Sequence, residues 1–576
     1  MKKENKTISY TLRLGFISGV MILAVAVLIG RAVQLQLIDQ EMLQQEGNAR
    51  YLREVEIPAN RGTIYDRNEE PVAISTPVTS IWVDPPVFLE PTKKDTDPAK
   101  QLISVTKLAQ LLDTDSDDLR NKLESRKNKR FVYIRRRVPP HIGQAAANLD
   151  LRGLHVKKEY KRFYPAGGVV SQVVGFCGTE NIGLEGLESA YNDWMTGRPG
   201  KKRVVVDLAG NIIDEVVQLS PASPGKDLHL SIDLRLQRVA FNALESAVIK
   251  HKAQSGSIVA LNVETGEVLA MANYPTYNPN HPDKPLDGRM KNLAVTDMVE
   301  PGSVIKAFTI AAGLESGLFK ANSVINTSPG TYRVAGHTVR DVHNYGRLDV
   351  TGVITKSSNV GASKIALAIE KEEFWDVLRR FGFGQVTGSG FTGEVAGLLP
   401  PYRSWHKVEQ ATLAYGYRLN VTSLQLARAY AALANNGKIR TPTFLKGGVS
   451  TVETVLDPNL AQQVQQMLAT VTKTGGTGTR AQVENYHIAG KTGTTKKVGA
   501  GGYESNYVAS FAGFAPLDVP KVVVTVVIDN PQGEEYYGGS VAAPVFQQVM
   551  AAALRLFDVR PDNVNPIRVA SLGGGQ

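Results

Sequence analysis

A serine and a lysine three residues apart are the first pair in this sequence that could do covalent chemistry. Ser303 and Lys306 lie where a Pro-Gly pair gives way to a run of apolar and small residues up to Leu314. Such a run predicts a buried helix, and residues three apart share one of its faces. The start of a helix favours developing negative charge. Burial lowers the pKa of a lysine, so Lys306 can act as a neutral base toward a Ser303 nucleophile.

A short Ser-x-Asn motif further along the chain supplies the next groups that such a site needs. It consists of Ser357 and Asn359. The Ser357 hydroxyl can relay a proton, and the Asn359 amide can hydrogen-bond both the Lys306 amine and an amide of the substrate.

A Lys-Thr-Gly-Thr run brings a second cation to the same chemistry. It comprises Lys491, Thr492, Gly493 and Thr494. Lys491 can hold a substrate carboxylate with the Thr492 hydroxyl as its partner, and its charge is expected to lower the pKa of Lys306 further. The backbone N–H groups of Ser303 and Thr494 can form an oxyanion hole. The three motifs in this order predict acyl transfer through a serine.

Other copies of these short patterns are weaker candidates. Ser-x-x-Lys also occurs away from any predicted buried helix, at Ser104, Ser223 and Ser404. Lys473 begins a second Lys-Thr-Gly, but the density of glycine there predicts a loop. Lys491 instead follows residues 486–490, which can run as a strand. We therefore prefer Ser303 and Lys491.

Three further motif matches fail in their surroundings. A Gly-x-Gly-x-x-Gly pattern at 388–393 does not open a helix, as a dinucleotide site requires. A P-loop ending at Lys491 would need glycine where the chain has Asn485. Metal-like spacing among turn residues, without an obvious third strong ligand, occurs at His337, Asp341 and His343. We therefore expect neither a metal nor a cofactor.

The charge balance is basic but spread along the chain. Lys and Arg number 65 against 55 Asp and Glu, giving a formal net charge of +10, with no basic patch interleaved with aromatic residues. This distribution argues against nucleic-acid binding and suits an anionic envelope surface. The single cysteine, Cys177, excludes an intramolecular disulfide and is expected to be a small buried side chain.

The elements that must position the motifs follow a Pro-, Gly- and Ser-rich boundary at 219–226. We expect strands at 228–232 and 521–528, helices at 234–251 and 541–556, and a hairpin formed by 257–261 with 267–272. This pattern predicts an α+β domain over residues 227–558. Residues 559–576 lack periodicity and are expected to form a disordered tail.

The N-terminal segment carries the signal for cellular location. Residues 14–30 form an uncharged apolar run whose helix can extend to residue 38 and span a membrane. Basic residues precede it, so residues 1–13 are expected in the cytoplasm and the bulk of the chain in the periplasm. No small-x-small cleavage site follows, which favours an uncleaved, single-pass anchor over residues 14–38. Gly15 and Gly19 form a Gly-x-x-x-Gly pair that can pack against another membrane helix.

Residues 39–220 are predicted to form a separate mixed α+β module, with helices at 101–112 and 116–123. Arg61 and Arg67 flank a strand-like run in this module. Two interpretations of these arginines stay open. They form an internal salt bridge that holds the module, or they transmit contact with a partner protein to the catalytic domain.

The motifs together resemble those of the class B penicillin-binding proteins, over nearly the whole chain. The division-specific type matches best, because residues 491–497 are followed by Gly-Gly-Tyr at 501–503. Other matching stretches are residues 61–68, 162–165, 183–188, 255–261 and 271–275. Two departures concern substrate and antibiotic preference rather than the chemistry: Glu69 stands where glycine is usual, and Val304-Ile305 replace Thr-Phe.

The resemblance implies an antiparallel sheet flanked by helices, with the serine on a central helix. It implies a peptidoglycan D,D-transpeptidase of the cytoplasmic (inner) membrane that works at the division septum. Ser303 would attack the D-Ala-D-Ala carbonyl of a stem peptide, release D-alanine and pass the acyl group to a neighbouring stem amine. β-Lactam antibiotics would acylate the same serine. The implied partners are an integral membrane glycan polymerase of the FtsW type and other division proteins, contacted through the anchor and the pedestal module 39–220.

Several alternatives remain at this point. An elongation-type transpeptidase or a hydrolytic D,D-carboxypeptidase would carry the same motifs. A β-lactamase is disfavoured, because a diffusible hydrolase has no use for the long anchored module. A division scaffold or β-lactam sensor that acylates without turnover should carry a signalling domain, and the segment before Leu14 is too short for one.

Overall fold

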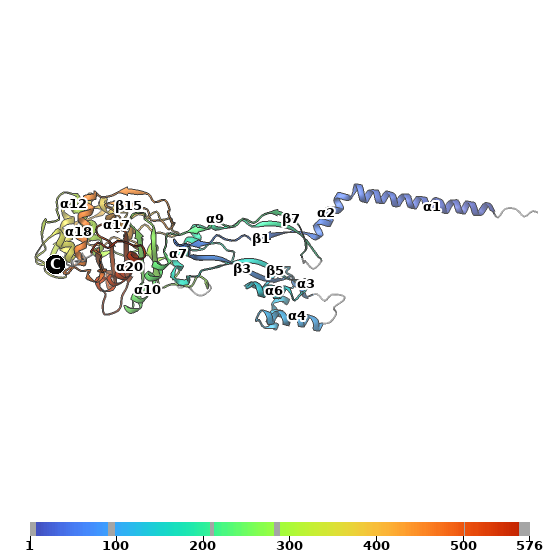
Figure 1. Ribbon diagram of the computed structural model, residues 1–576, viewed down its shortest axis with the longest axis horizontal. Coiled ribbons are helices and arrows are strands. Elements are labelled where there is room, and N and C mark those ends of the chain that lie inside the picture. The colour runs from blue at the N-terminus through green and yellow to red at the C-terminus, as the bar shows by residue number, and fades with distance from the viewer. Residues whose placement is uncertain (1–6, 90–97, 208–211, 282–288, 500–501, 564–576) are drawn as a thin grey trace, which may run out of the picture. The chain divides into compact units, whose positions relative to one another are not determined.

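The structure, a computed structural model, describes residues 7–89, 98–207, 212–281, 289–499 and 502–563. The predictions for residues 1–6, residue 501 and residues 564–576 lie outside the described residues. The chain divides into two compact units, each drawn from separate stretches of sequence (Figure 1). The first contains the chain up to Asn60, Pro77–Lys161 and Gly197–Pro224; the second contains Arg61–Thr76, Arg162–Thr196 and the chain from Gly225 onward.

The first unit holds a three-stranded antiparallel sheet and a small helical cluster. The sheet has the order β1-β6-β7, formed by β1 (Leu52–Ile57), β6 (Gly200–Val206) and β7 (Ile212–Ser220). The other elements are α2 (Gln40–Tyr51), β3 (Pro71–Val83), α3 (Pro85–Leu89), α4 (Pro98–Leu111), α5 (Ser116–Glu124), β4 (Val132–Val138), α6 (Pro140–Ala147) and β5 (Leu154–Phe163), of which β3 and β5 continue into the second unit. The helices predicted at 101–112 and 116–123 are confirmed as α4 and α5, which share an apolar core with β3 and β4.

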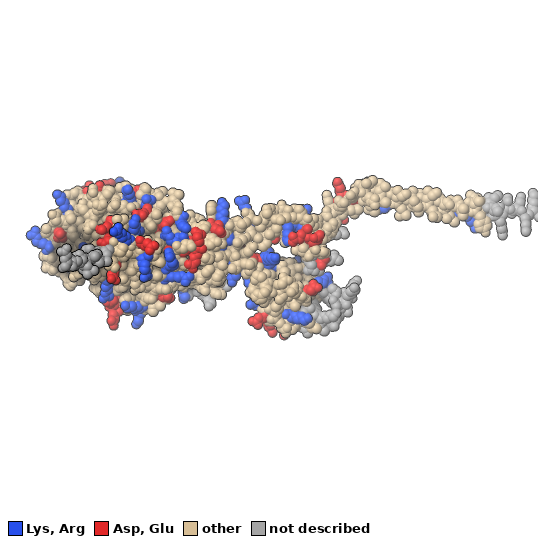
Figure 2. Space-filling model, in the orientation of Figure 1, with Lys and Arg blue, Asp and Glu red and all other residues tan. Residues whose placement is uncertain are grey.

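A long apolar helix precedes this sheet in the chain. Helix α1 (Thr7–Val33) continues into a π-helical stretch (Gln34–Ile38). Within it, Tyr10–Ile38 is long and apolar enough to cross a membrane, and its most apolar stretch of 18 residues is not buried by other described residues. Charged side chains are sparse along its surface in Figure 2. A helix that is apolar all round and uncovered is unfavourable in water and suited to a bilayer. The segment Tyr10–Ile38 contains residues 14–38, which the sequence predicts as the anchor.

A five-stranded antiparallel sheet forms the centre of the second unit. Its order is β10-β9-β19-β18-β17, with elements β9 (Ser255–Asn262), β10 (Val268–Tyr274), β17 (Ala489–Gly499), β18 (Gly502–Ala515) and β19 (Val522–Asp529). The predicted hairpin and the predicted strand at 521–528 are confirmed as β9, β10 and β19. Strand β17, which carries the Lys-Thr-Gly-Thr run, is an edge strand, so one of its sides has no neighbour in the sheet.

Helices cover both faces of this sheet, because side chains along each strand alternate between two apolar cores. Ile258 and Ala260 join the core with α10 (Leu234–Lys250) and α20 (Ala543–Leu556). Val259 and Leu261 join a core that contains Leu424 and Ala427 of α17 (Ser423–Ala434), on the opposite face. The predicted helix at 234–251 is α10, and the one at 541–556 is α20, preceded by the short α19 (Gly538–Val541).

Helix α12 (Lys306–Glu315) is buried along almost its whole length, between other helices of the second unit. The larger are α13 (Val350–Lys356), α14 (Asn359–Ala368), α15 (Lys371–Arg380), α16 (Lys407–Leu413) and α18 (Pro458–Thr472). Shorter helices and turns are 3₁₀ Gly167–Val169, α7 (Ser171–Val174), α8 (Gly186–Ala190), α9 (Asn192–Met195), α11 (Leu293–Thr296), 3₁₀ Gly302–Ile305, 3₁₀ Tyr402–Ser404 and 3₁₀ Thr479–Ala481. Short strands are β2 (Ile64–Tyr65), β8 (Leu228–His229), β11 (Val324–Asn326), β12 (Thr331–Val334), β13 (His337–Arg340), β14 (Arg347–Asp349), β15 (Lys438–Arg440) and β16 (Val452–Thr454).

Two segments before the predicted boundary belong to the second unit. Strand β2 pairs in parallel with β8, which is shorter than the strand expected at 228–232. The Asp66 carboxylate accepts a hydrogen bond from the backbone N–H of Leu234, at the start of α10, at 3.1 Å. The segments 61–76 and 162–196 thus pack with the chain beyond residue 225, although they lie far from it in sequence.

A buried ion cluster holds these two segments together. Glu188 accepts hydrogen bonds from the Nε of Arg61 at 2.7 Å and from the Nε of Arg162 at 2.6 Å, and all three side chains are buried. The Cys177 thiol donates to Glu188 at 3.2 Å. Burial and the Glu188 charge raise the pKa of Cys177 to about 12. Cys177 is therefore a poorly reactive thiol.

The first residues of the expected tail are fixed in place. The Asp562 carboxylate accepts hydrogen bonds from the backbone N–H groups of His487 at 2.7 Å and Leu517 at 2.8 Å. The Tyr486 hydroxyl donates to the carbonyl of Val559 at 2.6 Å. The tail prediction for 559–576 therefore does not hold for residues 559–563, and a single carboxylate that satisfies two backbone groups is the reason.

Candidate active site

The turn that carries Ser303 is a 3₁₀ turn, Gly302–Ile305, at the start of α12. Gly302 has a φ of +61° and donates its N–H to the carbonyl of Gly416 at 3.2 Å. A Cβ on Gly416 would come within 2.2 Å of the Gly302 oxygen, so glycine is required for this close approach. Ser303 is half-buried, whereas the residues after it are fully buried. The turn therefore holds one partly accessible hydroxyl at the end of a rigid, buried helix.

The Lys306 amine lies in a fully buried position and donates to three oxygens. They are the Ser357 carbonyl at 2.6 Å, the Asn359 Oδ1 at 2.7 Å and the Ser357 hydroxyl at 3.2 Å. Burial lowers the pKa of Lys306 to about 7, against an opposing effect of the Asp341 carboxylate. The contact that the sequence predicts between Asn359 and Lys306 is present. No hydrogen bond joins Lys306 to the Ser303 hydroxyl within the described residues.

The Ser-x-Asn motif occupies the junction between α13 and α14. Ser357 ends α13 in the left-handed conformation, with a φ of 60°, a strained backbone for a non-glycine residue. This turn directs both its carbonyl and its hydroxyl toward Lys306. The Ser358 hydroxyl then caps α14 by accepting from the N–H of Gly361 at 2.8 Å.

Asp341 supports this junction from a neighbouring turn. Its carboxylate accepts from the Ser358 hydroxyl at 2.6 Å, the Asn359 N–H at 2.5 Å and the Val360 N–H at 3.0 Å. Sequence reasoning considered Asp341 only as a metal ligand and missed this role. Among the described residues, no group of three His, Cys, Asp or Glu side chains is placed to hold a metal ion. Asp341 lies 17 residues before Ser358, where helix α14 starts. Helix-capping patterns in sequence involve neighbouring residues, so they give little sign of such a distant partner.

Lys491 is fully buried on the edge strand β17. Its amine donates to the carbonyl of Thr492 at 3.1 Å and to the hydroxyl of Thr492 at 3.3 Å. The Thr492 hydroxyl also contacts that of Thr477 at 2.8 Å. Burial and the charge of Lys306 lower the pKa of Lys491 well below its ordinary value. The repulsion between two buried ammonium groups is mutual, so it disfavours the state in which both lysines are positively charged.

The rest of the Lys-Thr-Gly-Thr run packs closely beside the nucleophile turn. A Cβ at Gly493 would lie 2.2 Å from the Ser510 hydroxyl and 2.8 Å from the Pro301 oxygen, so only glycine fits. The Thr494 hydroxyl accepts from the N–H of Gly538 at 2.9 Å. Strand β17 is thus held at van der Waals distance from the residues that precede Ser303.

Within the second unit, the other copies of Ser-x-x-Lys and Lys-Thr-Gly are at Ser404 and Lys473. Ser404 is exposed and donates to the carbonyl of Pro401 at 2.8 Å. Lys473 is exposed at the end of α18. The structure therefore gathers Lys306, Ser357 and Asn359 in direct contact and keeps Lys473 in a loop, as its glycine-rich neighbours predict.

Comparison with known proteins gives the class of this chain. Residues 256–551 match the profile described as the penicillin binding protein transpeptidase domain, and residues 56–230 match the penicillin-binding protein dimerisation domain. The chain is 40% identical to the probable peptidoglycan D,D-transpeptidase PbpC of Pseudomonas aeruginosa, covering 94% of this chain and 95% of that protein. It is also 40% identical to the peptidoglycan D,D-transpeptidase FtsI of Escherichia coli K12, covering 96% and 92%.

A solved structure agrees with this grouping. The transpeptidase domain of Burkholderia pseudomallei penicillin-binding protein 3 superposes with a TM-score of 0.54 and 38% sequence identity, covering 58% of this chain and 97% of that one. The chain belongs to the class B penicillin-binding proteins. It is a peptidoglycan D,D-transpeptidase, with a dimerisation domain and a transpeptidase domain built on an antiparallel sheet.

Proposed function

We propose that Ser303 forms the acyl-enzyme of this transpeptidase and that Lys306 is its base. The observation that carries the proposal is the state of the Lys306 amine. It is fully buried, its three acceptors carry no charge, and its pKa is lowered to about 7. An amine of this kind is neutral in a large fraction of molecules near pH 7 and can accept a proton from a hydroxyl one helical turn away.

The acylation step follows from these positions. The Ser303 oxygen attacks the carbonyl carbon of the penultimate D-alanine, and its proton passes to the Lys306 amine. The C–N bond to the terminal D-alanine breaks, and the leaving nitrogen takes a proton, with the Ser357 hydroxyl as relay. Free D-alanine departs, and an ester joins the donor stem to Ser303. A β-lactam opens by the same attack, but its leaving nitrogen stays tethered to the acyl group.

Transfer of the acyl group to the acceptor runs through the same steps as acylation, in reverse order. The amine of a neighbouring stem peptide attacks the ester carbonyl and loses a proton to the base. The bond to the Ser303 oxygen breaks, and the hydroxyl is restored by protonation. The product is an amide cross-link between two stems.

The remaining site residues bind and orient the donor. Asn359 holds Lys306 through its Oδ1 and offers its N–H₂ to the substrate amide. Lys491 and the Thr492 hydroxyl bind the terminal carboxylate, while Gly493 keeps the strand close to the nucleophile turn. The backbone N–H groups of Ser303 and Thr494 stabilise the oxyanion. No cofactor takes part.

The cellular role proposed for the enzyme is cross-linking at the division septum. The similarity to FtsI of Escherichia coli supports it. An integral membrane glycan polymerase of the FtsW type and other division proteins are the proposed partners. The proposed topology has one membrane span among the described residues, the helix at Tyr10–Ile38, with basic residues before it in the cytoplasm and the bulk of the chain in the periplasm.

Fluorescent penicillin labelling followed by peptide mapping tests the nucleophile. The parent protein should carry the label on the peptide that contains Ser303, and Ser303→Ala should remain unlabelled with an unchanged thermal melt. A label that survives in the variant, or maps to Ser104, Ser223 or Ser404, contradicts the proposal.

Three further experiments test the remaining claims. A reporter that is active only in the periplasm, fused after Gln576, should be active, and mass spectrometry should find the N-terminus near Met1. An N-terminus beyond Gly30 would convert the anchor into a cleaved signal. Depletion should produce filaments, whereas round cells would assign the enzyme to elongation.

A further inference from the structure

A broad groove lies in the second unit, away from the residues of the proposed active site. Its volume is about 930 Å³, and it is lined by the first half of α18, the end of α17 and the turns after β9 and β18. Seven of its lining residues are amides: Asn435, Asn436, Asn459, Gln462, Gln463, Gln465 and Gln466. Such a density of uncharged donors and acceptors in one concave surface is the feature that requires an explanation.

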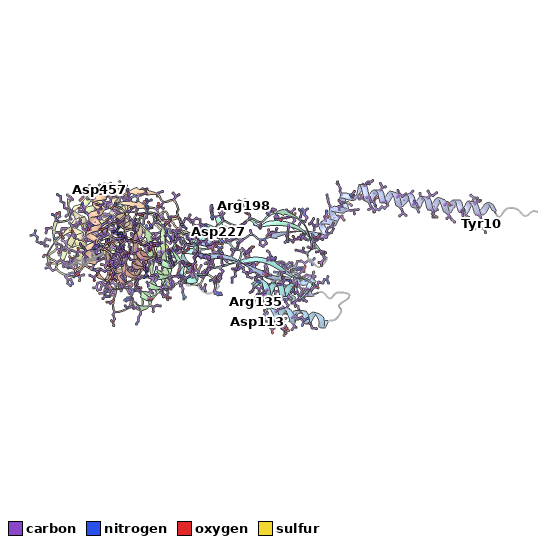
Figure 3. All side chains as sticks on the ribbon, in the orientation of Figure 1. Tyr10, Asp113, Arg135, Arg198, Asp227 and Asp457 are labelled. Atoms are coloured by element: carbon purple, nitrogen blue, oxygen red, sulfur yellow. The ribbon has the colours of Figure 1, made fainter. Side chains whose placement is uncertain are left out.

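Four of these amides form one stripe on α18. Asn459, Gln462, Gln463 and Gln466 recur at helical spacing and are exposed, whereas the intervening Ala461 and Val464 are buried. Asp457, labelled in Figure 3, fixes the start of this helix by accepting from the N–H of Asn459 at 2.8 Å. The side-chain amides of the four residues form no hydrogen bond within the part of the chain that the structure describes.

The floor of the groove is rigid. Gln465 is buried and donates to the carbonyl of Leu433 at 2.7 Å and to the Asn436 side chain at 3.2 Å. These bonds join α18 to the end of α17, so the exposed amides stand on a fixed surface. The backbone beneath the exposed amides is therefore fixed in advance, and the entropy lost when a ligand binds is that of the four exposed side chains.

The chemistry of the lining favours a saccharide. An amide both donates and accepts, which matches hydroxyl and acetamido groups, whereas a charged side chain offers only one of the two. Apolar contacts for the C–H face of a sugar are available from Val519, which is 58% exposed, and Pro520. Two carboxylates also line the groove: Glu264 is paired with Lys521 at 2.5 Å, and Asp518 is exposed. Among the described lining residues none is aromatic or arginine, the types that dominate protein–protein hot spots.

The groove is connected to the proposed active site through α18 itself. At the far end of this helix the Thr472 hydroxyl donates to the carbonyl of Ile488, just before β17, at 2.7 Å. The loop that follows accepts from Lys356, the neighbour of Ser357, at 2.8 Å. The helix between the two sites is roughly 20 Å long at about 1.5 Å per residue. A stem peptide of five residues spans about 17 Å when extended, which is a comparable length.

We propose that this groove binds the glycan strand of peptidoglycan, a neutral polymer of N-acetylated β-linked amino sugars. The strand lies across the amide stripe of α18 while one of its stem peptides extends toward β17. The proposal rests on the D,D-transpeptidase assignment and is independent of which residue is the nucleophile. It gives the enzyme a means to select stems that are attached to a glycan over free peptides.

Ligand-observed NMR on the full-length protein in detergent micelles tests the site. The probe is tetra-N-acetylchitotetraose, a stem-free β-linked amino-sugar oligomer, with maltotetraose as the neutral sugar that lacks acetamido groups. The parent should bind the first and not the second. Gln462→Ala with Gln466→Ala should weaken binding about tenfold or more, since two amides are lost and alanine preserves the helix. Gln548→Ala, an exposed amide on α20, should bind as the parent does.

A kinetic measurement separates this site from the proposed nucleophile. The double variant should be acylated by penicillin at the parental rate, while the KM for a glycan-linked stem donor rises about tenfold and kcat stays unchanged. Three results would overturn the proposal. The parent fails to bind chitotetraose, the double variant binds it as tightly as the parent does, or the parent binds maltotetraose equally well. Loss of penicillin acylation in Ser303→Ala together with intact chitotetraose binding is the pattern expected if both proposals hold.

Discussion

The amine of Lys306 donates to the Oδ1 of Asn359 over 2.7 Å, and the lysine is fully buried. A neutral acceptor at this position leaves the charge of the lysine uncompensated. The low pKa of Lys306, about 7, therefore depends on the absence of a carboxylate at residue 359 as well as on burial.

The first prediction replaces this neutral acceptor by a charged one. Asn359→Asp places a carboxylate beside the Lys306 amine, which favours the ammonium form and raises the pKa of Lys306. Only the neutral amine accepts the Ser303 proton, so the acylation rate rises with pH through this pKa. Stopped-flow acylation by penicillin should show a half-maximal rate near pH 7 in the parent and at a higher pH in the variant.

The matched control is Asn121→Asp, an exposed asparagine on α5 in the first unit. Its pH profile should overlay that of the parent. An Asn359→Asp profile with an unchanged midpoint would show that the neutral state of Lys306 does not limit acylation.

The second prediction removes the carboxylate that opposes the lowered pKa of Lys306. Asp341→Asn takes away a negative charge that raises this pKa, so the midpoint of the acylation profile should move to lower pH. The same change weakens the three hydrogen bonds that hold residues 358–360, so the maximal rate should fall about 10-fold or more.

Asp349→Asn serves as the control for this substitution. Asp349 also caps a helix, α13, by accepting from the N–H of Gly352 at 2.6 Å. It should lower stability slightly and leave the pH midpoint in place. A midpoint that moves equally in both variants would assign the effect to helix capping rather than to the charge of Asp341.

The third prediction distinguishes the two Lys-Thr-Gly copies. Lys491→Ala removes a buried cation beside Lys306 and the proposed carboxylate partner, so the acylation rate constant should fall about 100-fold or more. Lys473→Ala changes an exposed loop residue and should leave the rate within about twofold. The reverse ranking would place the catalytic strand elsewhere.

The fourth prediction concerns Arg61. Arg61→Ala leaves the buried Glu188 carboxylate with fewer donors, and breaking a buried pair in this way costs about 3–5 kcal/mol. We expect a large fall in the apparent melting temperature, with reduced acylation as a consequence. The internal ion-pair interpretation of this arginine is therefore the one that the contacts support.

Arg67→Ala is a matched control from the same strand-like run. Arg67 pairs with Glu267 at 3.4 Å and keeps 22% of its side chain exposed, whereas Arg61 is fully buried, so the loss of Arg67 should lower the melting temperature less than the loss of Arg61. Equal melting temperatures for the Arg61 and Arg67 variants would contradict the structural role, and failed cell division with an unchanged melt would restore the partner role.

The elements of the second unit could be predicted well because their signals are local. The apolar spacing over residues 234–251 gives α10, and the two short runs 257–261 and 267–272 on either side of a turn give the hairpin β9–β10, since each pattern needs only a window of neighbouring residues. The Ser-x-x-Lys, Ser-x-Asn and Lys-Thr-Gly motifs could also be found, in this order, from the sequence alone without knowledge of the fold.

What the sequence did not predict depends on contacts across long separations. The segment 61–76 belongs with the chain after residue 225, because Arg61 meets Glu188 and Asp66 meets the start of α10. Asp341 acts on a helix start 17 residues further along. No local pattern reports such partners, because a buried carboxylate and a surface carboxylate look alike in sequence.

The position of β17 at the sheet edge has a consequence for the protein in concentrated solution. An unpaired strand edge is a template on which a second copy of the chain could align, and natural proteins commonly counter this with lysines. Strand β17 carries Lys496 and Lys497 beyond the Lys-Thr-Gly-Thr run; Lys497 is paired with Asp529 at 2.8 Å, whereas Lys496 is exposed. Like charges on two such edges repel, so the strand should resist edge-to-edge aggregation. Replacing Lys496 with a neutral β-branched residue would therefore be expected to increase self-association at low ionic strength.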